Sequence, residues 1–199
     1  MNEKFFDLKK EKQDRMINAA LKVFAKNGYR HASTDEIVAE AGISKGLLFH
    51  YFGSKMGLYS FLYDYSVRYM ILELKSCVSD SEKDYFAIMK SVETAKLASL
   101  NNYPYMQAFI DKSQTEEDEE AIDETYDMRA ELQEVYDAIL NQVDASAFRA
   151  GVDPAALDSI LSYALRGIMN EQLQTTSFNA VAYHAEAVKY IEMLKIMAY

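Results

Sequence analysis

Three side chains that can donate hydrogen bonds lie close together in the short run 45–51: Lys45, His50 and Tyr51. A lysine ammonium can donate to O6 and N7 of guanine, while His50 and Tyr51 can bond to phosphate oxygens or base edges. Gly46 lacks a side chain and lets the backbone come close to a groove. These residue types at this spacing indicate binding to nucleic acid.

Two short helices in the stretch 33–52, STDEIVAEAGISKGLLFHYF, must position these side chains. Ser33 is placed to cap the first helix, and Glu36 to reach back to that cap, as in a capping box. Gly42 suits the left-handed residue that ends a helix, and Ser44 can cap a second helix over 45–51. Helix, glycine turn and helix in this order form a helix-turn-helix, whose second helix enters the major groove of DNA.

The apolar positions predict which face of the second helix is buried. Leu48 and Phe52 lie one turn apart, so they are expected to face a core shared with Phe24 of a preceding helix over 14–27. The outer faces are then expected to carry Lys45, Gly46, Leu47, Phe49, His50 and Tyr51.

The run ISKGLLFHYFGSK, preceded by a Ser-Thr-x-x-Ile helix and followed by a long apolar helix, resembles the signature of the tetracycline-repressor (TetR) family. The resemblance covers about Arg15 to Leu62. It implies a homodimeric repressor that binds a palindromic operator in double-stranded DNA and leaves it when a small-molecule effector binds. The residues expected at the DNA are Ser33, Thr34, Ser44, Lys45, Gly46, Leu47, Phe49, His50, Tyr51 and Lys55.

Two positions depart from the family pattern, because many members have Thr where Leu47 stands and Tyr where Phe49 stands. Without these hydroxyls, we expect base reading to depend more on apolar contact with thymine methyl groups. Lys55, in the first turn of the next helix, opposes the helix dipole. The resemblance gives a reason for it, since this lysine and the helix N-terminus would hold a phosphate.

Charge and composition separate this region from the rest of the chain. Residues 1–60 hold ten Lys/Arg and seven Asp/Glu, a net +3, whereas the remainder holds 21 − 10 = 11 basic and 31 − 7 = 24 acidic residues, a net −13. The basic part can touch phosphates, and the acidic part repels DNA. Residues 58–150 contain no glycine and one proline, which favours long helices. We predict an all-α fold of about nine helices, with an N-terminal three-helix bundle carrying the helix-turn-helix at 1–53 and a helical ligand-binding and dimerisation domain at 54–199.

The second domain is rich in Tyr, Phe and Met. Such residues at helical spacing are either plain core, the commoner case, or the lining of an apolar cavity with polar tips. The resemblance favours a cavity whose ligand and DNA bind antagonistically. The acidic surroundings suggest a largely apolar ligand that is neutral or cationic. The expected lining residues are Tyr103, Met106, Phe109, Tyr126, Tyr163 and Met169.

The last two predicted helices, from Pro154 and from about Asn179, are expected to form a dimer interface. The first is apolar around most of its circumference, which implies burial on more than one side. By resemblance the two helices pair with their copies as a four-helix interface, which would set two DNA-binding domains about 34–36 Å apart, one DNA turn. The expected interface residues are Leu161, Ala164, Leu165, Ile168, Ala185, Val188 and Ile191.

Other function classes have little support. His31, His50 and His184 are far apart in the sequence and lie in no metal or nucleophile motif, so we expect no catalysis, metal or cofactor. Cys77 is the only cysteine, which excludes an intrachain disulfide. No run resembles a signal peptide or a membrane span, which predicts a cytoplasmic protein with no membrane partner. The alternative is a DNA-bound adaptor whose C-terminal domain recruits a protein instead of a metabolite.

Overall fold

The computed structural model describes residues 3–174 and 178–199. All secondary structure in these residues is helical, with ten α-helices and two short 3-10 helices, which confirms the all-α prediction. One helix more than the expected nine is present, because the helical segment between residues 119 and 141 is interrupted at Thr125 and forms two helices. These are α7 (Glu119–Glu124) and α8 (Tyr126–Asn141). The Thr125 hydroxyl donates to the carbonyl of Ala121 at 2.8 Å and so satisfies an acceptor at the end of α7.

Contacts divide the helices into two units. The first comprises Met1–Tyr69 and Asn102–Leu132, and the second comprises Met70–Asn101 and Gln133–Tyr199. Helices α4 (Lys55–Cys77) and α8 each contribute several residues to both units. The contacts do not divide the chain between residues 53 and 54. The domain boundary expected there, between a DNA-binding and a ligand-binding domain, stays a prediction.

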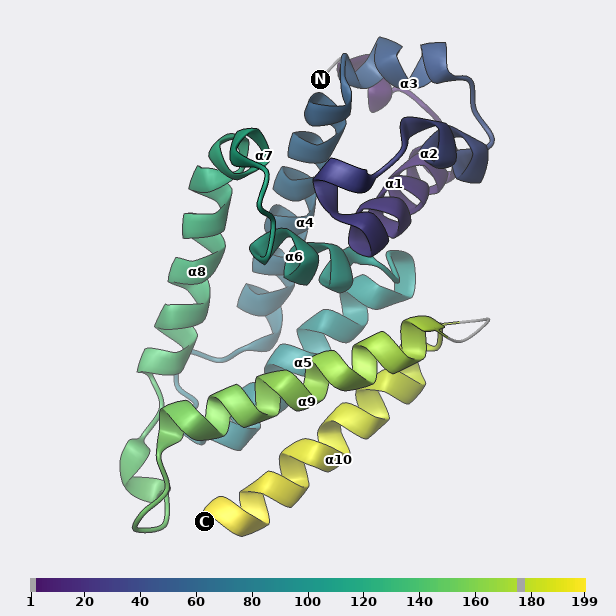
Figure 1. Cartoon of the computed structure of the whole chain (residues 1–199). Coiled ribbons are helices and arrows are strands. Elements are labelled where there is room, and N and C mark those ends of the chain that lie inside the picture. Colours follow the sequence, from purple (N-terminus) through teal and green to yellow (C-terminus); the bar gives the residue numbers. More distant parts are fainter. Residues whose placement is uncertain (1–2, 175–177) are drawn as a thin grey trace. The chain divides into compact units, whose positions relative to one another are not determined.

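The first unit is built around α1 (Lys10–His31), which packs against α2 (Thr34–Ala41) and α6 (Met106–Gln114) (Figure 1). The rings of Phe24, Tyr59 and Phe109 lie 5.1 to 6.1 Å apart and form the centre of its core. Burial raises the pKa of Tyr59 to about 12. The helical geometry is interrupted at Gly28, near the predicted end of this helix, because a φ of 68° is accessible to glycine at little cost, but helical residues continue to His31.

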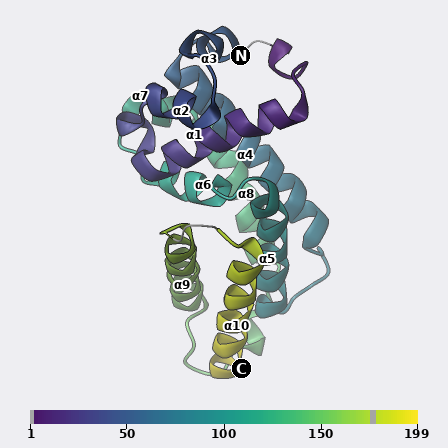
Figure 2. The ribbon, with the colours of Figure 1, turned by 90° about the vertical axis from the view of Figure 1, so that its right-hand side faces the viewer.

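The second unit contains α5 (Tyr85–Asn102), η2 (Ala145–Ala147), α9 (Pro154–Gln174) and α10 (Ala180–Ala198). Helices α9 and α10 pack against each other (Figure 1). Figure 2 shows α10 beside α5, where Lys90 and Glu192 form an ion pair of 2.7 Å. The side chain of Asn179 caps α10, and Asp153 accepts from the amide of Ala155 before α9, so both predicted helix starts are confirmed.

A buried ion pair joins two of these helices through a tyrosine. Glu93 of α5 is 1% exposed, and Lys96 Nζ donates to its carboxylate at 2.7 Å. The hydroxyl of Tyr183, on α10, donates to the other carboxylate oxygen at 2.9 Å. Burial lowers the pKa of Lys96, but the charge of Glu93, with Tyr183, Tyr136 and the hydrogen bond to Glu93, more than offsets it and holds the pKa well above 10.5. The pair is therefore charged and neutralised inside the protein.

Candidate nucleic-acid interface

Local side-chain bonds hold α2 and α3 (Lys45–Phe52) in the predicted helix-turn-helix. Ser33 Oγ accepts from the amides of Asp35 and Glu36, and Ser44 Oγ accepts from the amide of Leu47 at 3.2 Å. Gly42 has φ 62° and ψ 44°, the left-handed conformation expected at the turn. The Glu36 carboxylate accepts from the side chain of Asn27 at 3.5 Å, so it serves the preceding helix instead of completing the capping box.

Helix α3 presents a surface of mixed chemistry. Leu48 and Phe52 are buried, as predicted from their spacing. Lys45, Gly46 and His50 are exposed, while Leu47 and Phe49 are half-buried with part of each side chain at the surface. A Cβ on Gly46 would touch nothing within 4 Å, so the space beside it is open to a partner. Two donors and two apolar side chains of α3 are thus accessible at its surface.

Tyr51 was expected on the outer face of α3, but it is buried. It is only 8% exposed, because η1 (Glu3–Phe5) packs against α3. Phe5 is fully buried, with its ring centroid 5.8 Å from that of Tyr51, 5.1 Å from that of Phe52 and 5.5 Å from that of Phe61. The expectation failed because the covering residue lies far from α3 in the sequence. Only the apolar pair Phe5–Phe6 in an otherwise charged segment gave a sign of it.

Lys45 already has a partner in the first turn of α2. Its ammonium lies 2.8 Å from Asp35 Oδ1, with side chains that are 47% and 73% exposed. An exposed ion pair of this kind contributes between zero and about 1 kcal/mol. Lys45 can therefore exchange Asp35 for a DNA acceptor at small cost, and Asp35 is a residue of this surface that the sequence pattern did not predict.

Lys55 is engaged inside the first unit. Its ammonium donates to the carbonyls of Tyr29, Arg30 and Ala32 at 2.9, 3.4 and 3.3 Å. It also lies 4.4 Å from the centre of the Tyr29 ring. An ammonium has three donors, and all three are directed at the α1–α2 connection. This geometry favours bracing of α2 over the expected phosphate contact, which stays a prediction.

Of the remaining residues expected at the DNA, Ser33 and Ser44 are exposed and Thr34 is half-exposed. The two serine oxygens accept helix amides, so each hydroxyl hydrogen remains available to donate. Both cap positions lie at helix N-termini, where backbone amides and the helix dipole favour a phosphate.

Comparison with known proteins agrees with this geometry. Residues 16–60 match the family described as bacterial regulatory proteins, tetR family. Residues 16–60 are therefore assigned to this family. YerO, an HTH-type transcriptional regulator of Bacillus subtilis (strain 168), is 24% identical over 172 residues, which cover 85% of this chain and 57% of YerO. The chain thus spans little more than half the length of this relative.

Solved structures of transcriptional regulators show a similar fold along nearly the whole chain. A TetR-family transcriptional regulator from Chloroflexus aurantiacus has a TM-score of 0.62 at 19% identity, with 99% of this chain and 97% of that protein covered. KstR2 of Mycobacterium tuberculosis, described as a ketosteroid transcriptional regulator, has a TM-score of 0.69 at 16% identity, with 96% of each chain covered. At these identities the similarity concerns the fold alone.

The six residues expected to line a ligand cavity are divided between the two units, and the cavity that they were expected to line stays a prediction. Tyr103, Met106 and Phe109 are buried in the first unit, where the Tyr103 hydroxyl bonds to Lys10, Asp14 and Tyr65. Tyr126 and Tyr163 are 66% and 69% exposed, and Met169 is buried in the second unit. Most of these aromatic residues are therefore core or surface, the commoner reading of such spacing. A pocket in the second unit, lined by other residues, is described below.

The expected dimer residues fall into two groups. Leu161, Leu165, Ile168 and Ile191 are buried within the single chain. Ala164 and Val188 are half-buried, and Ala185 is exposed. The outward faces of α9 and α10 carry other large apolar residues, which are Ile160, Tyr163, Val181, Met193, Ile196 and Met197, each more than half exposed.

Two further findings bear on the expected absences. Within residues 3–174 and 178–199, no group of three His, Cys, Asp or Glu side chains could hold a metal ion. None of the helices in the same residues is long and apolar enough to cross a bilayer.

Proposed function

We propose that this protein is a homodimeric transcriptional repressor of the TetR family that leaves a palindromic operator when a small molecule binds its C-terminal domain. The observation that carries the proposal is the accessible face of α3, with Lys45, Gly46 and His50 exposed above a buried Leu48. Its length suits the major groove, and its donors suit guanine and phosphate.

The outward faces of α9 and α10 support the proposed dimer. Six large apolar side chains on two adjacent helices are unusual on the surface of a monomer and suit a second copy of the chain. Ala185 and Ala164 allow close approach between helices at this face. A twofold dimer presents two copies of α3, which accounts for a palindromic site.

Leu47 and Phe49 support a particular mode of base reading. Both side chains reach the surface beside Lys45 without a hydroxyl group. We propose that they contact thymine methyl groups, whereas Lys45 contacts guanine. Replacing thymine by uracil at A·T pairs of the operator removes only the methyl group and should weaken binding, and equal affinity for both duplexes would contradict this mode.

Selection of bound sequences from a random duplex pool at two salt concentrations tests the main proposal. A palindrome recovered at both concentrations, and bound more weakly by Lys45→Ala, is the expected result. Enrichment of no sequence, with only weak salt-sensitive binding, would overturn sequence-specific regulation. Light scattering of the same preparation measures the dimer. A monomer that still binds the operator and captures another protein through α9 and α10 would favour the adaptor instead.

A further inference from the structure

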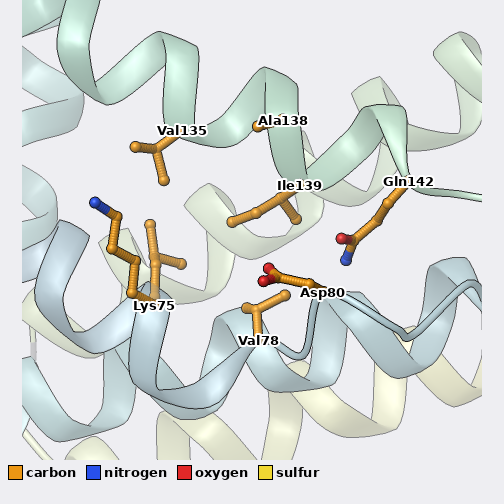
Figure 3. Close-up of a pocket in the computed structure, with 8 residues that line it drawn as sticks. Lys75, Val78, Asp80, Val135, Ala138, Ile139 and Gln142 are labelled. Carbon is orange, nitrogen blue, oxygen red and sulfur yellow. The ribbon is translucent and has the colours of Figure 1, made fainter.

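The second unit contains a pocket of about 160 Å³, partly open to solvent (Figure 3). Its walls are the end of α4, the loop after it, and the C-terminal half of α8. The four apolar side chains that line it are Leu74, Val78, Val135 and Ile139. Leu74 and Ile139 are buried, whereas Val78 and Val135 are half-buried.

The volume limits the apolar part of a ligand to about one ring. An apolar cavity of about 150 Å³, lined by leucine, isoleucine and phenylalanine side chains, is enough to hold one benzene molecule. The pocket is thus too small for a polycyclic or long-chain ligand to enter completely, and its aliphatic walls suit an aromatic or cyclohexyl group.

The polar groups of the pocket are arranged with acceptors at one end. Figure 3 shows the Asp80 carboxylate near the middle, with the Gln142 amide to one side and the Lys75 ammonium at the opposite end, beside Val135. Gln142 Nε2 donates to the carbonyl of Ser79 at 3.3 Å, and this bond leaves Gln142 Oε1 as an acceptor. A carboxylate and an amide oxygen together favour a ligand with several N–H donors and positive charge.

We propose that this pocket binds a small amphipathic amine, with its ring against Leu74, Val135 and Ile139 and its ammonium bonded to Asp80 and Gln142. The assignment rests on the proposed function, because it takes the pocket as the effector site of the regulator. One wall of the pocket is α4, the same helix whose first turn contains Lys55. An amine bound against Leu74 therefore bears directly on a helix that also belongs to the first unit.

Lys75 points to a competing ligand, which the experiment must distinguish from an amine. Its ammonium would attract an anionic group to the other end of the pocket, so an aryl carboxylate is the competing ligand. Three probes with the same phenyl ring and similar length distinguish these cases: phenethylamine, phenethyl alcohol and hydrocinnamate.

Isothermal titration of the full chain with these probes tests the proposal. Phenethylamine should bind at least about tenfold more tightly than the alcohol or the acid, since only its ammonium can form a charge-assisted hydrogen bond with the Asp80 carboxylate. Asp80→Asn should weaken amine binding about tenfold. Ala138→Phe, which places a ring at an exposed position of the pocket wall, should abolish it.

Asp137→Asn is the matched control, because Asp137 is a neighbouring exposed carboxylate on α8 that does not line the pocket. It should leave the amine affinity unchanged. Amine binding that survives both Asp80→Asn and Ala138→Phe, or a preference for hydrocinnamate that Lys75→Ala removes, would overturn the proposal.

Fluorescence anisotropy with the selected operator separates this proposal from the function on which it rests. Operator binding that is weakened by phenethylamine, and not in Asp80→Asn, supports both. Operator binding unaffected by an amine that does bind would overturn the effector role of the pocket while leaving the regulator intact. Failure to bind any operator would overturn the proposed function itself.

Discussion

Two ion pairs of nearly equal length lie in opposite surroundings. Lys45 and Asp35 are 2.8 Å apart on the exposed surface of α2 and α3, whereas Lys96 and Glu93 are 2.7 Å apart with side chains 14% and 1% exposed. Water screens the first pair and competes for its donors, so either partner can leave it. The second pair has no such competitor, and its loss would strand a charge inside the protein. Distance alone therefore does not say whether a charge is available for function.

The largest expected effect comes from removing one buried charge. Glu93→Gln should lower the free energy of unfolding by about 3–5 kcal/mol, because the Lys96 charge stays buried without its partner. Urea denaturation monitored by circular dichroism measures the loss. The double variant Glu93→Gln/Lys96→Met should recover most of it, and a double variant as unstable as the single one would show that packing, and not charge, is responsible.

Alkaline pH should weaken the same pair without mutation. The pKa of Lys96 is raised in the folded protein, so its stabilising contribution is complete below about 10.5 and is lost as the pH rises through the folded-state pKa. Above pH 10.5 the free energy of unfolding should fall more steeply in the natural protein than in Glu93→Gln/Lys96→Met. Denaturation curves at stepped alkaline pH compare the two proteins, in which all tyrosines are shared. Parallel curves would contradict the assignment.

A moderate effect, on DNA binding alone, is expected at the exposed pair. Lys45→Ala should raise the Kd for the operator about tenfold, given roughly 1–3 kcal/mol per good base contact, and change stability by less than about 1 kcal/mol. Fluorescence anisotropy over a salt series also identifies the acceptor. Relaxed sequence preference would indicate a base contact, whereas a salt slope reduced by about one would indicate a phosphate contact. An unchanged Kd would remove Lys45 from the interface.

The smallest effect is expected from the other member of that pair. Asp35→Asn removes a negative charge beside the DNA and frees Lys45, so operator affinity should rise about two- to threefold at low salt. Raising the salt concentration should shrink this gain. Weaker binding at low salt would mean that Asp35 positions Lys45 for the DNA instead of competing with it.

Local signals made the DNA-binding region predictable. Ser33, Gly42 and Ser44 act on backbone groups within a few residues, and Leu48 and Phe52 follow helical periodicity, so their roles can be read from the sequence. Tyr51 could not be placed in this way, because Phe5 covers it from a distant part of the chain. The predicted base contacts remain untested.

The pocket could not be predicted from the sequence, because its residues come together only in the folded protein. Lys75 and Asp80 meet Gln142 only through tertiary packing, and nothing in their sequence neighbourhoods distinguishes them from ordinary surface residues. Aromatic composition pointed to Tyr103 and Phe109, but ring size favours burial in any core, and here both belong to the core of the first unit. The composition therefore predicted a large apolar core, but it could not predict where a pocket would lie.

The buried Phe5 has a practical consequence for anyone who prepares this protein. Trimming the chain by five residues, through proteolysis or a downstream translation start, would remove the ring that touches Tyr51, Phe52 and Phe61. The remaining polypeptide would keep every residue of α2 and α3 and would still match its family by sequence. It would nevertheless expose an aromatic patch that promotes aggregation. If a preparation is inactive or aggregated, intact-mass spectrometry should therefore first establish whether the N-terminal residues are present.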